Sequence, residues 1–278
     1  MSPAAPPFDE SAAQPGIRIE VLATSVGAAR LALLGGADRI ELCENDPMGG
    51  TTPSAGTIET VLELAEPRGV PVHVMLRPRP GGFVFDRHER SVMRRDLHTA
   101  LGLGAHGFVV GVLTADGDVD RRLLDELVEE AQGRAVTFHR AVDIARELEV
   151  AVETAFDHGC DRVLTSGGAP TAVQGARMLA RLVRNAPVGR IVMAGGGITP
   201  GTVAELVADT LVPEIHVGAR SYRVTGASPS PPGMTGITAG PTPQHPVNGW
   251  PAPDVEQLAA IRDALVDIAP SGRFGDAD

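Results

Sequence analysis

Several residue types are scarce in this sequence, and each shortage excludes a class of protein. Two cysteines, Cys43 and Cys160, are too few for a disulfide framework, and neither belongs to a C-x-x-C pair. One Trp and one Tyr leave few platforms on which bases or sugars can stack. The unpaired cysteines favour a reducing compartment, which we expect to be the cytoplasm.

Charge and hydropathy exclude two further kinds of partner. The net charge of −11 and the pI near 5.2 oppose binding to nucleic acid, because that affinity comes largely from basic residues. An anionic membrane is excluded for the same reason, and no stretch approaches the roughly 18 consecutive apolar residues of a membrane span. Residues 1–16 lack the basic start and apolar core of a signal peptide, so we predict a disordered N-terminal tail there.

The rest of the composition is that of a globular protein. Hydrophobic residues make up 43% of the chain and charged residues 21%, which is enough apolar content for a sizeable core. Strand-like and helix-like segments alternate over residues 17–270, and this order builds a parallel sheet covered by helices. The pattern predicts the α/β class and a single-domain (β/α)8 TIM barrel. Its strands are expected near 17–22, 38–43, 71–76, 107–112, 135–139, 161–165, 190–194 and 213–217.

Helix boundaries are also marked. Ser25, Ser54 and Asp120 each stand before a run of helical periodicity and suit the N-cap position. Thr199 is followed by Pro200, which is a cap followed by proline at the first helical position. A last helix near 254–268 closes the barrel, and residues 271–278 are predicted to be a loose C-terminus.

The segment 224–252 stands apart because it is dense in Pro, Gly, Ser and Thr. Such a composition excludes a helix or a central strand. Connections this long inside a compact domain are usually lids, subunit contacts or disordered segments. We therefore expect a long loop at 224–252 within the barrel domain.

A short internal repeat relates three of the predicted strands. GADRIEL at 36–42 resembles GCDRVLT at 159–165, and GAHGFVV at 104–110 is a looser third copy. The pairs Asp38-Arg39 and Asp161-Arg162 then lie at the N-terminal floor of the barrel, away from the end that carries active sites. We expect both pairs to form structural ion pairs there.

The alternation of side chains places polar residues inside the predicted barrel. In PVHVMLR, Val72 and Val74 point one way, and His73, Met75 and Arg77 point the other. Four other strands show the same two-sided pattern, and their inward residues include Glu20, Glu41, Cys43, His139 and His216.

Four of these inward groups suit acid–base chemistry. His139 stands at a strand end, followed at once by Arg140 and then by Asp143, and we assign it a catalytic role. Glu20 and Glu41, on neighbouring strands, are candidate catalytic carboxylates that share a proton, bind a cation, pair with Arg77 or form a structural ion network. His73 is a further catalytic candidate, and His216 a substrate-binding one, although each also suits a hydrogen-bonded core position.

Other features suit an anionic ligand. RPRPGG at 77–82 places Arg77 and Arg79 on a turn, where guanidinium groups bind carboxylate or phosphate or are held by an acidic neighbour. TSGG at 165–168 and AGGG at 194–197 follow strands, where backbone amides cradle anions. Substrate-binding residues are expected to include Arg77, Arg140, Asp143, Thr165, Ser166 and His216.

Taken in order, these segments resemble the CutC family of copper homeostasis proteins. The resemblance rests on GADRIELCENDPMGGTTPS, VHVMLRPRPGGF, GVLTADGDVD, VTFHRAVD, DRVLTSGG, IVMAGGGI and EIHVGAR, within residues 17–223. It implies a (β/α)8 barrel, a cytoplasmic location, a homo-oligomer such as a homodimer, and copper binding or tolerance. Many members have cysteine at the end of the first strand, where this chain has Leu22 and Ala23, so Cys43 is the one matching thiol.

The residues and the resemblance support different functions. The family implies copper as the ligand, with Cys43 as the metal-binding thiol and His or Met residues assisting. The polar interior favours an enzyme that acts on a small anionic or sugar-like molecule. In that second hypothesis His139 is the general acid or base, Glu41 or Glu20 is its partner, and Arg77 and Arg140 hold the substrate.

Overall fold

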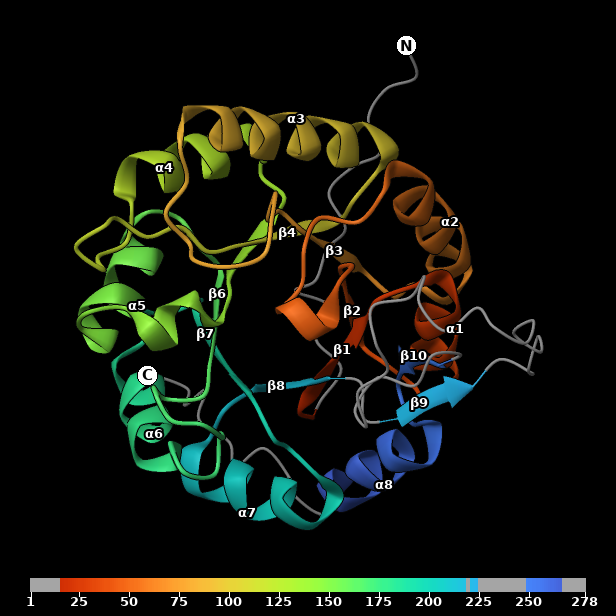
Figure 1. Cartoon of the computed structure of the whole chain (residues 1–278). Helices are drawn as coiled ribbons and strands as arrows, with labels where there is room; N and C mark the ends of the chain where they lie inside the picture. The colour runs from red at the N-terminus through yellow and green to blue at the C-terminus, as the bar shows by residue number, and fades with distance from the viewer. Residues whose placement is uncertain (1–15, 219–220, 225–248, 267–278) are drawn as a thin grey trace, which may run out of the picture.

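A ring of helices surrounds a closed barrel of parallel strands (Figure 1). The computed structural model describes residues 16–218, 221–224 and 249–266. Each barrel strand pairs in parallel with the next, and the last pairs with the first, which confirms the predicted (β/α)8 TIM barrel. The strands are β1 (Arg18–Ala23), β2 (Arg39–Leu42), β3 (Val72–Met75), β4 (Gly107–Val110), β5 (Ala135–Phe138), β6 (Arg162–Thr165), β7 (Ile191–Gly195) and β8 (Glu214–Val217).

The helices follow the strands in the expected alternation. The outer ring consists of α1 (Val26–Leu34), α2 (Ala55–Ala65), α3 (Arg87–Leu103), α4 (Arg121–Glu130), α5 (Leu148–Asp157), α6 (Ala176–Asn185), α7 (Pro200–Thr210) and α8 (Val255–Val266). Three short 3-10 helices are η1 (Asp46–Met48), η2 (Glu66–Arg68) and η3 (Arg140–Ile144). Among the described residues, none of the helices has the length and hydropathy needed to cross a bilayer.

The predicted caps are present. Ser25 Oγ accepts a hydrogen bond from the Ala28 amide at 3.1 Å, and Ser54 Oγ accepts from the Thr57 amide at 3.2 Å. Asp120 caps α4 in the same way, and Pro200 is the first residue of α7. These bonds satisfy amides that have no partner within the helix, which explains why the helices begin where the sequence predicts.

The segment 224–252 is described only at its ends. β9 (Ser221–Val224) and β10 (Gly249–Ala252) pair as an antiparallel two-stranded sheet outside the barrel. Residues 225–248, most of the predicted tail at 1–16, and the predicted loose end at 271–278 lie outside the described residues. The long-loop and tail assignments therefore stay predictions.

The internal repeat has a common structural role at the barrel floor. Asp38 donates its amide to the Ile19 carbonyl and accepts the Ile19 amide on its carboxylate at 2.8 Å. Asp161 forms the same two bonds with Val136. Its amide donates to the Val136 carbonyl, and its carboxylate accepts the Val136 amide at 2.8 Å. In the third copy the imidazole of His106 takes the place of the carboxylate, because its Nδ1 accepts the amide of Val72 at 3.1 Å. Each copy thus fixes the register between its own strand and the preceding strand of the barrel.

The arginines of the repeat point inward and form the predicted ion pairs. Arg39 and Arg162 both reach the carboxylate of Glu214, and Arg162 Nε lies 3.0 Å from Glu214 Oε2. Arg39 Nε also lies 2.5 Å from Glu20 Oε2. All four side chains are buried, so the floor of the barrel is a closed ionic layer. Buried charges of this kind persist only when they are paired.

Candidate site at the barrel mouth

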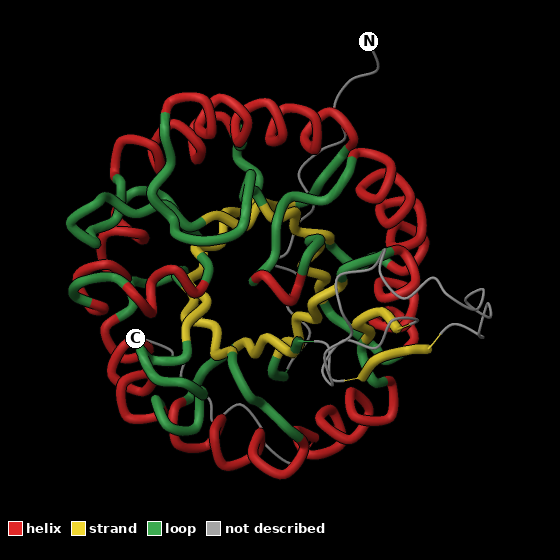
Figure 2. The backbone as a smooth tube through the Cα atoms, viewed as in Figure 1, coloured by secondary structure: helices red, strands yellow, loops and turns green. Residues whose placement is uncertain are grey.

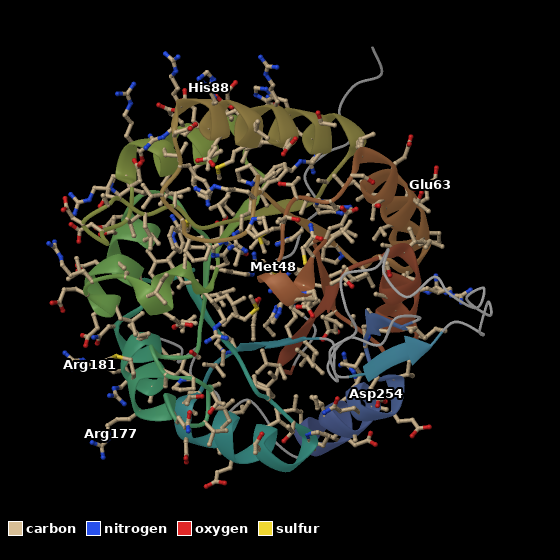
Figure 3. The ribbon with its side chains drawn as sticks, viewed as in Figure 1. Met48, Glu63, His88, Arg177, Arg181 and Asp254 are labelled. Atoms are coloured by element: carbon tan, nitrogen blue, oxygen red, sulfur yellow. The ribbon has the colours of Figure 1, made fainter. Side chains whose placement is uncertain are left out.

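The centre of the mouth is covered by the segment that follows β2. In Figure 2 the short helix η1 lies inside the ring of strands, and Met48 is labelled at the same place in Figure 3. Glu44 and Thr51 pair through both their amides and carbonyls, which closes residues 44–51 into a compact loop. We call residues 44–51 the cover loop. Asn45, Gly49 and Gly50 all have positive φ angles, of 55°, 83° and 81°, so the turn depends on residues that tolerate this backbone region.

Cys43 lies directly beneath the cover loop. Its side chain belongs to a buried apolar cluster with Leu22, Met75 and Val109. A Cβ atom at Gly50 would lie 3.3 Å from Cys43 Sγ and 3.4 Å from Met75 Cε, so the two sulfur-bearing side chains meet under this glycine. Burial, together with the carboxylate of Glu41, raises the pKa of the Cys43 thiol well above its usual range. The free thiol is therefore protonated at neutral pH.

A second group below the mouth joins two carboxylates to one imidazole. His216 Nδ1 lies 2.7 Å from Glu20 Oε1, and His216 Nε2 lies 3.4 Å from Glu41 Oε2. The ligand atoms of these three buried residues all lie within 4.8 Å of one another, which is a spacing that a metal ion can bridge. Glu41 Oε1 has no hydrogen-bond partner among the described residues.

The pKa values of the two carboxylates are shifted in opposite directions. Burial alone raises the pKa of Glu20, but the Arg39 guanidinium and the hydrogen bond to His216 hold it well below its usual range. Burial raises the pKa of Glu41 to about 7, and the nearby Glu20 carboxylate adds to this rise. Burial lowers the pKa of His216, but the two carboxylates outweigh it and leave that pKa raised. The group thus keeps a proton near neutral pH.

His73 lies deeper, in a space that a glycine provides. A Cβ atom at Gly107 on the neighbouring strand would come within 2.6 Å of the His73 ring, so the imidazole lies over β4. His73 is fully buried, as the alternation of β3 predicts. Its catalytic role stays a prediction.

Arg77 holds the cover loop in place. Its Nη1 donates to the carbonyls of Met48, Gly49 and Gly50, and its Nη2 donates to the carbonyl of Gly81 at 2.6 Å. The guanidinium is buried and lies over the Phe83 ring, 4.8 Å from its centroid. The two amino groups are therefore directed at loop carbonyls, and Arg77 pairs with neither Glu20 nor Glu41. This corrects the alternative in which Arg77 pairs with a glutamate.

Arg79 is held by an acidic residue and by carbonyls of its own loop. Its Nε forms an ion pair with Glu89 on α3, and its Nη1 donates to the Gly82 carbonyl at 2.9 Å. It is therefore an acidic neighbour that holds this arginine, as one of the two predicted alternatives states.

His139 faces a different set of neighbours from the two glutamates. Its Nδ1 accepts the amide of Ala141 at 3.0 Å, so the side chain caps η3, and its ring lies 5.0 Å from that of Phe83. Burial, with a contribution from Arg77, lowers the pKa of His139 to about 3. The imidazole that meets Glu20 and Glu41 is that of His216. His139 is neutral here, and its role as a general acid or base stays a prediction.

Four of the predicted substrate-binding residues meet at the ends of β5 and β6. Asp143 accepts hydrogen bonds from the Thr165 hydroxyl, from the Ser166 amide at 3.1 Å and from the Gly168 amide at 3.0 Å. Arg140 Nε lies 2.8 Å from Asp143 Oδ2, and Arg140 Nη2 donates to Ser166 Oγ at 2.7 Å. The sequence therefore placed these residues together, and their role in binding a substrate stays a prediction.

The cover loop was not identified from the sequence. The run Asn45-Asp46-Pro47-Met48-Gly49-Gly50 carries strong turn signals, which alone can indicate a tight loop after β2. Nothing in that run says that the loop folds inward over the barrel rather than outward. That direction depends on Arg77, which lies 27 to 29 residues further along the chain.

The donors of the mouth divide by chemical type. The thiol of Cys43 and the thioether of Met75 are soft ligands of the kind that select the cuprous ion. Glu20, Glu41 and His216 offer oxygen and nitrogen atoms, which suit harder or borderline ions. The sulfur pair therefore fits copper, with Cys43 as its only thiol.

Comparison with known proteins places this arrangement in one family. The model of the CutC family matches residues 17–221. A CutC family protein of Histophilus somni (strain 2336) is 38% identical over 245 residues, which cover 88% of this chain and 97% of that protein. Another, of Chromobacterium violaceum (strain ATCC 12472), is 40% identical over 250 residues and covers 89% of this chain and 97% of its own length.

Solved structures agree with the fold. A structure from Streptococcus agalactiae, described provisionally as the copper homeostasis protein CutC, has a TM-score of 0.69 and 29% identity, and the match covers 73% of this chain and 98% of that one. Thiamine phosphate pyrophosphorylase from Pyrococcus furiosus has a TM-score of 0.55 at 18% identity over 89% of this chain and 95% of its own. The second likeness concerns the barrel fold alone.

Proposed function

The chain belongs to the CutC family, and on that premise we propose that it serves copper homeostasis by holding a cuprous ion at Cys43 and Met75 beneath the cover loop. One observation carries the proposal, namely that both sulfur-bearing side chains meet under Gly50 in a buried apolar cluster. Soft sulfur donors in an enclosed site favour Cu(I) over the harder divalent ions.

The chemistry of Cys43 sets the conditions for binding. Because its thiol is protonated when free, capture of the ion must release a proton. Its neighbours in the cluster, Leu22, Met75 and Val109, are buried and apolar. A cytoplasmic location and a homo-oligomeric assembly, which the family implies, stay predictions.

Copper titration tests this proposal. The protein is titrated with Cu(I) against a competing chelator, as wild type, Cys43→Ser and Cys160→Ser. Cys160 is the matched control, because it is equally buried but lies at the floor, between α5 and β6. We expect Cys43→Ser to lose high-affinity binding and Cys160→Ser to keep it. Equal affinity in wild type and Cys43→Ser would sink the proposal.

One specific observation favours a second candidate function, acid–base catalysis. Glu20, His216 and Glu41 form a buried chain inside the barrel, which runs from the ionic floor at Glu20 toward the mouth at Glu41, and Glu41 Oε1 has no partner among the described residues. Glu41 stands two residues before Cys43, on the side of the chain that faces the mouth, where barrel enzymes place their catalytic groups. In this candidate Glu41 transfers the proton to or from a small anionic or sugar-like substrate, while Glu20 orients His216.

A ligand screen tests the second candidate. Sugar acids and sugar phosphates are screened by thermal shift against wild type, Glu41→Gln and Glu44→Gln, the last being a neighbouring glutamate outside the buried chain. We expect a ligand that stabilises wild type and Glu44→Gln but has no effect on Glu41→Gln. If every stabilising ligand acts equally on all three proteins, the acid–base assignment is wrong.

A further inference from the structure

Arg140 is an arginine at the mouth whose charge is held in place yet still accessible. Its side chain is 41% exposed, whereas Arg77 is buried under the cover loop. Asp143 holds its Nε and Ser166 holds its Nη2, so two of its three nitrogen atoms are fixed by neighbours. The remaining Nη1 donates to no residue in the described part of the chain. A guanidinium fixed on two sides loses little entropy when a ligand binds the third.

The free side of Arg140 faces a turn of glycines. A Cβ atom at Gly196 would lie 3.2 Å from Arg140 Nη1 and 3.5 Å from the Cβ of Ser166. Gly196 and Gly197 have φ angles of +103° and +73°, which other residues rarely adopt. Neither glycine amide donates a hydrogen bond within residues that the structure describes, and both glycines are partly exposed. The turn therefore brings the Gly196 backbone beside the guanidinium, while the Thr171 side chain packs against Gly197.

These donors point to one class of ligand. We propose that Arg140 and the Gly196–Gly197 turn form a binding site for a phosphoryl group at the mouth of the barrel. The two hydrogens of Arg140 Nη1 and the two glycine amides together offer four N–H groups without a partner among the described residues. A phosphoryl group has three terminal oxygens and suits such a set.

The location supports the same assignment. The turn joins β7 to α7, and loops after the seventh and eighth strands are a frequent phosphate site in barrels of this fold. A Cβ atom at Gly195, the residue before the turn, would lie 3.3 Å from the Cβ of His216. The same Cβ atom would lie 2.5 Å from Leu164 Cδ1, so the turn lies near His216 with the buried Leu164 side chain beside it. The site shares no residue with the copper site at Cys43 and Met75, so it stands whether or not copper binds.

The test is calorimetric titration with inorganic phosphate in a phosphate-free buffer of low ionic strength. The variants are Arg140→Ala, Arg140→Gln and the matched control Arg79→Ala. Arg79 suits this role because its side chain is 38% exposed and also pairs with one carboxylate, that of Glu89. We expect saturable binding to wild type, affinity at least tenfold weaker in both Arg140 variants, and affinity within twofold of wild type for Arg79→Ala.

Each other result overturns the proposal. No saturable binding to wild type, or equal binding to wild type and a folded Arg140→Gln, would exclude the site. An equal loss in Arg79→Ala would indicate a general charge effect. Acetate that competes as well as phosphate would show that the turn selects carboxylates instead. Arg140→Gln guards against misfolding, because its amide nitrogen can still donate to Asp143 or Ser166.

Discussion

The two halves of the barrel mouth differ in what covers them. Beneath the cover loop, β1 to β4 contribute Leu22, Cys43, Met75 and Val109, which are buried and apolar. At the ends of β5 to β7, Arg140 and the glycine turn are partly exposed and polar. The difference shows how one barrel can enclose soft sulfur donors on one side and present charged donors to solvent on the other.

Arg77→Ala tests the closed half and should have the largest effect on stability. The guanidinium donates to four carbonyls from two loops, and hydrogen bonds from charged groups contribute about 1.5 to 3 kcal/mol each when buried. We expect the free energy of unfolding to fall by about 3 kcal/mol, measured by urea denaturation.

The same variant should expose Cys43. Loss of Arg77 frees the cover loop, so we expect alkylation of Cys43 to accelerate at least tenfold. Cys160 is an internal control in the same molecule, and its alkylation should keep its rate. The alkylation of both cysteines is measured by mass spectrometry on the native protein. Equal acceleration of both would mean general unfolding and would contradict the role of Arg77.

Asp143→Asn tests the open half with a smaller effect. The carboxylate accepts hydrogen bonds from Arg140, Thr165, Ser166 and Gly168, and the amide keeps its size but loses its charge. We expect thermal and urea denaturation to show a loss of about 2 kcal/mol. Cys43 alkylation should not change, and a marked acceleration would show that the two halves are not independent.

A pH dependence of stability should come from His139. Its pKa is about 3 in the folded protein and near the ordinary value of 6.5 when unfolded, so between these values the unfolded chain binds the extra proton. Stability should therefore fall as pH decreases below about 6.5, by about 1.4 kcal/mol per pH unit at most. His139→Asn, which can keep the cap on η3 without titrating, should flatten this part of the curve. Parallel curves for the two proteins would contradict the burial of a neutral ring.

Arg79→Ala should have the smallest effect. Its ion pair with Glu89 is partly exposed, and such pairs contribute about 0 to 1 kcal/mol. We expect a change in unfolding free energy below about 1 kcal/mol and no change in Cys43 alkylation. A loss comparable to that of Arg77→Ala would show that the 78–82 turn, rather than the Arg77 guanidinium, holds the cover loop.

Much of the fold could be predicted because local patterns determine it. The alternation of strand-like and helix-like segments placed all eight strands, and period-two alternation in five of them pointed His73, Met75 and Cys43 inward. Ser25 and Ser54 marked helix starts through bonds to nearby amides. The repeat around Asp38 and Asp161 was also informative, because each carboxylate accepts an amide of the strand beside it.

Pairing across the barrel could not be predicted in the same way. His139 and His216 are both inward histidines, and only the closure of the barrel brings β8 beside β1, so that His216 meets Glu20. Arg77 was predicted to point inward, but its carbonyl partners come from a loop with three positive φ angles earlier in the chain. Such contacts depend on long-range geometry that alternation does not encode.

X-ray absorption at the copper edge of the Cu(I)-loaded protein tests the role of the sulfur pair most directly. We predict two sulfur neighbours in wild type, one of them lost in Met75→Leu, because Cys43 and Met75 supply the two donors. A spectrum with only nitrogen or oxygen neighbours, or one unchanged by Met75→Leu, would contradict the account.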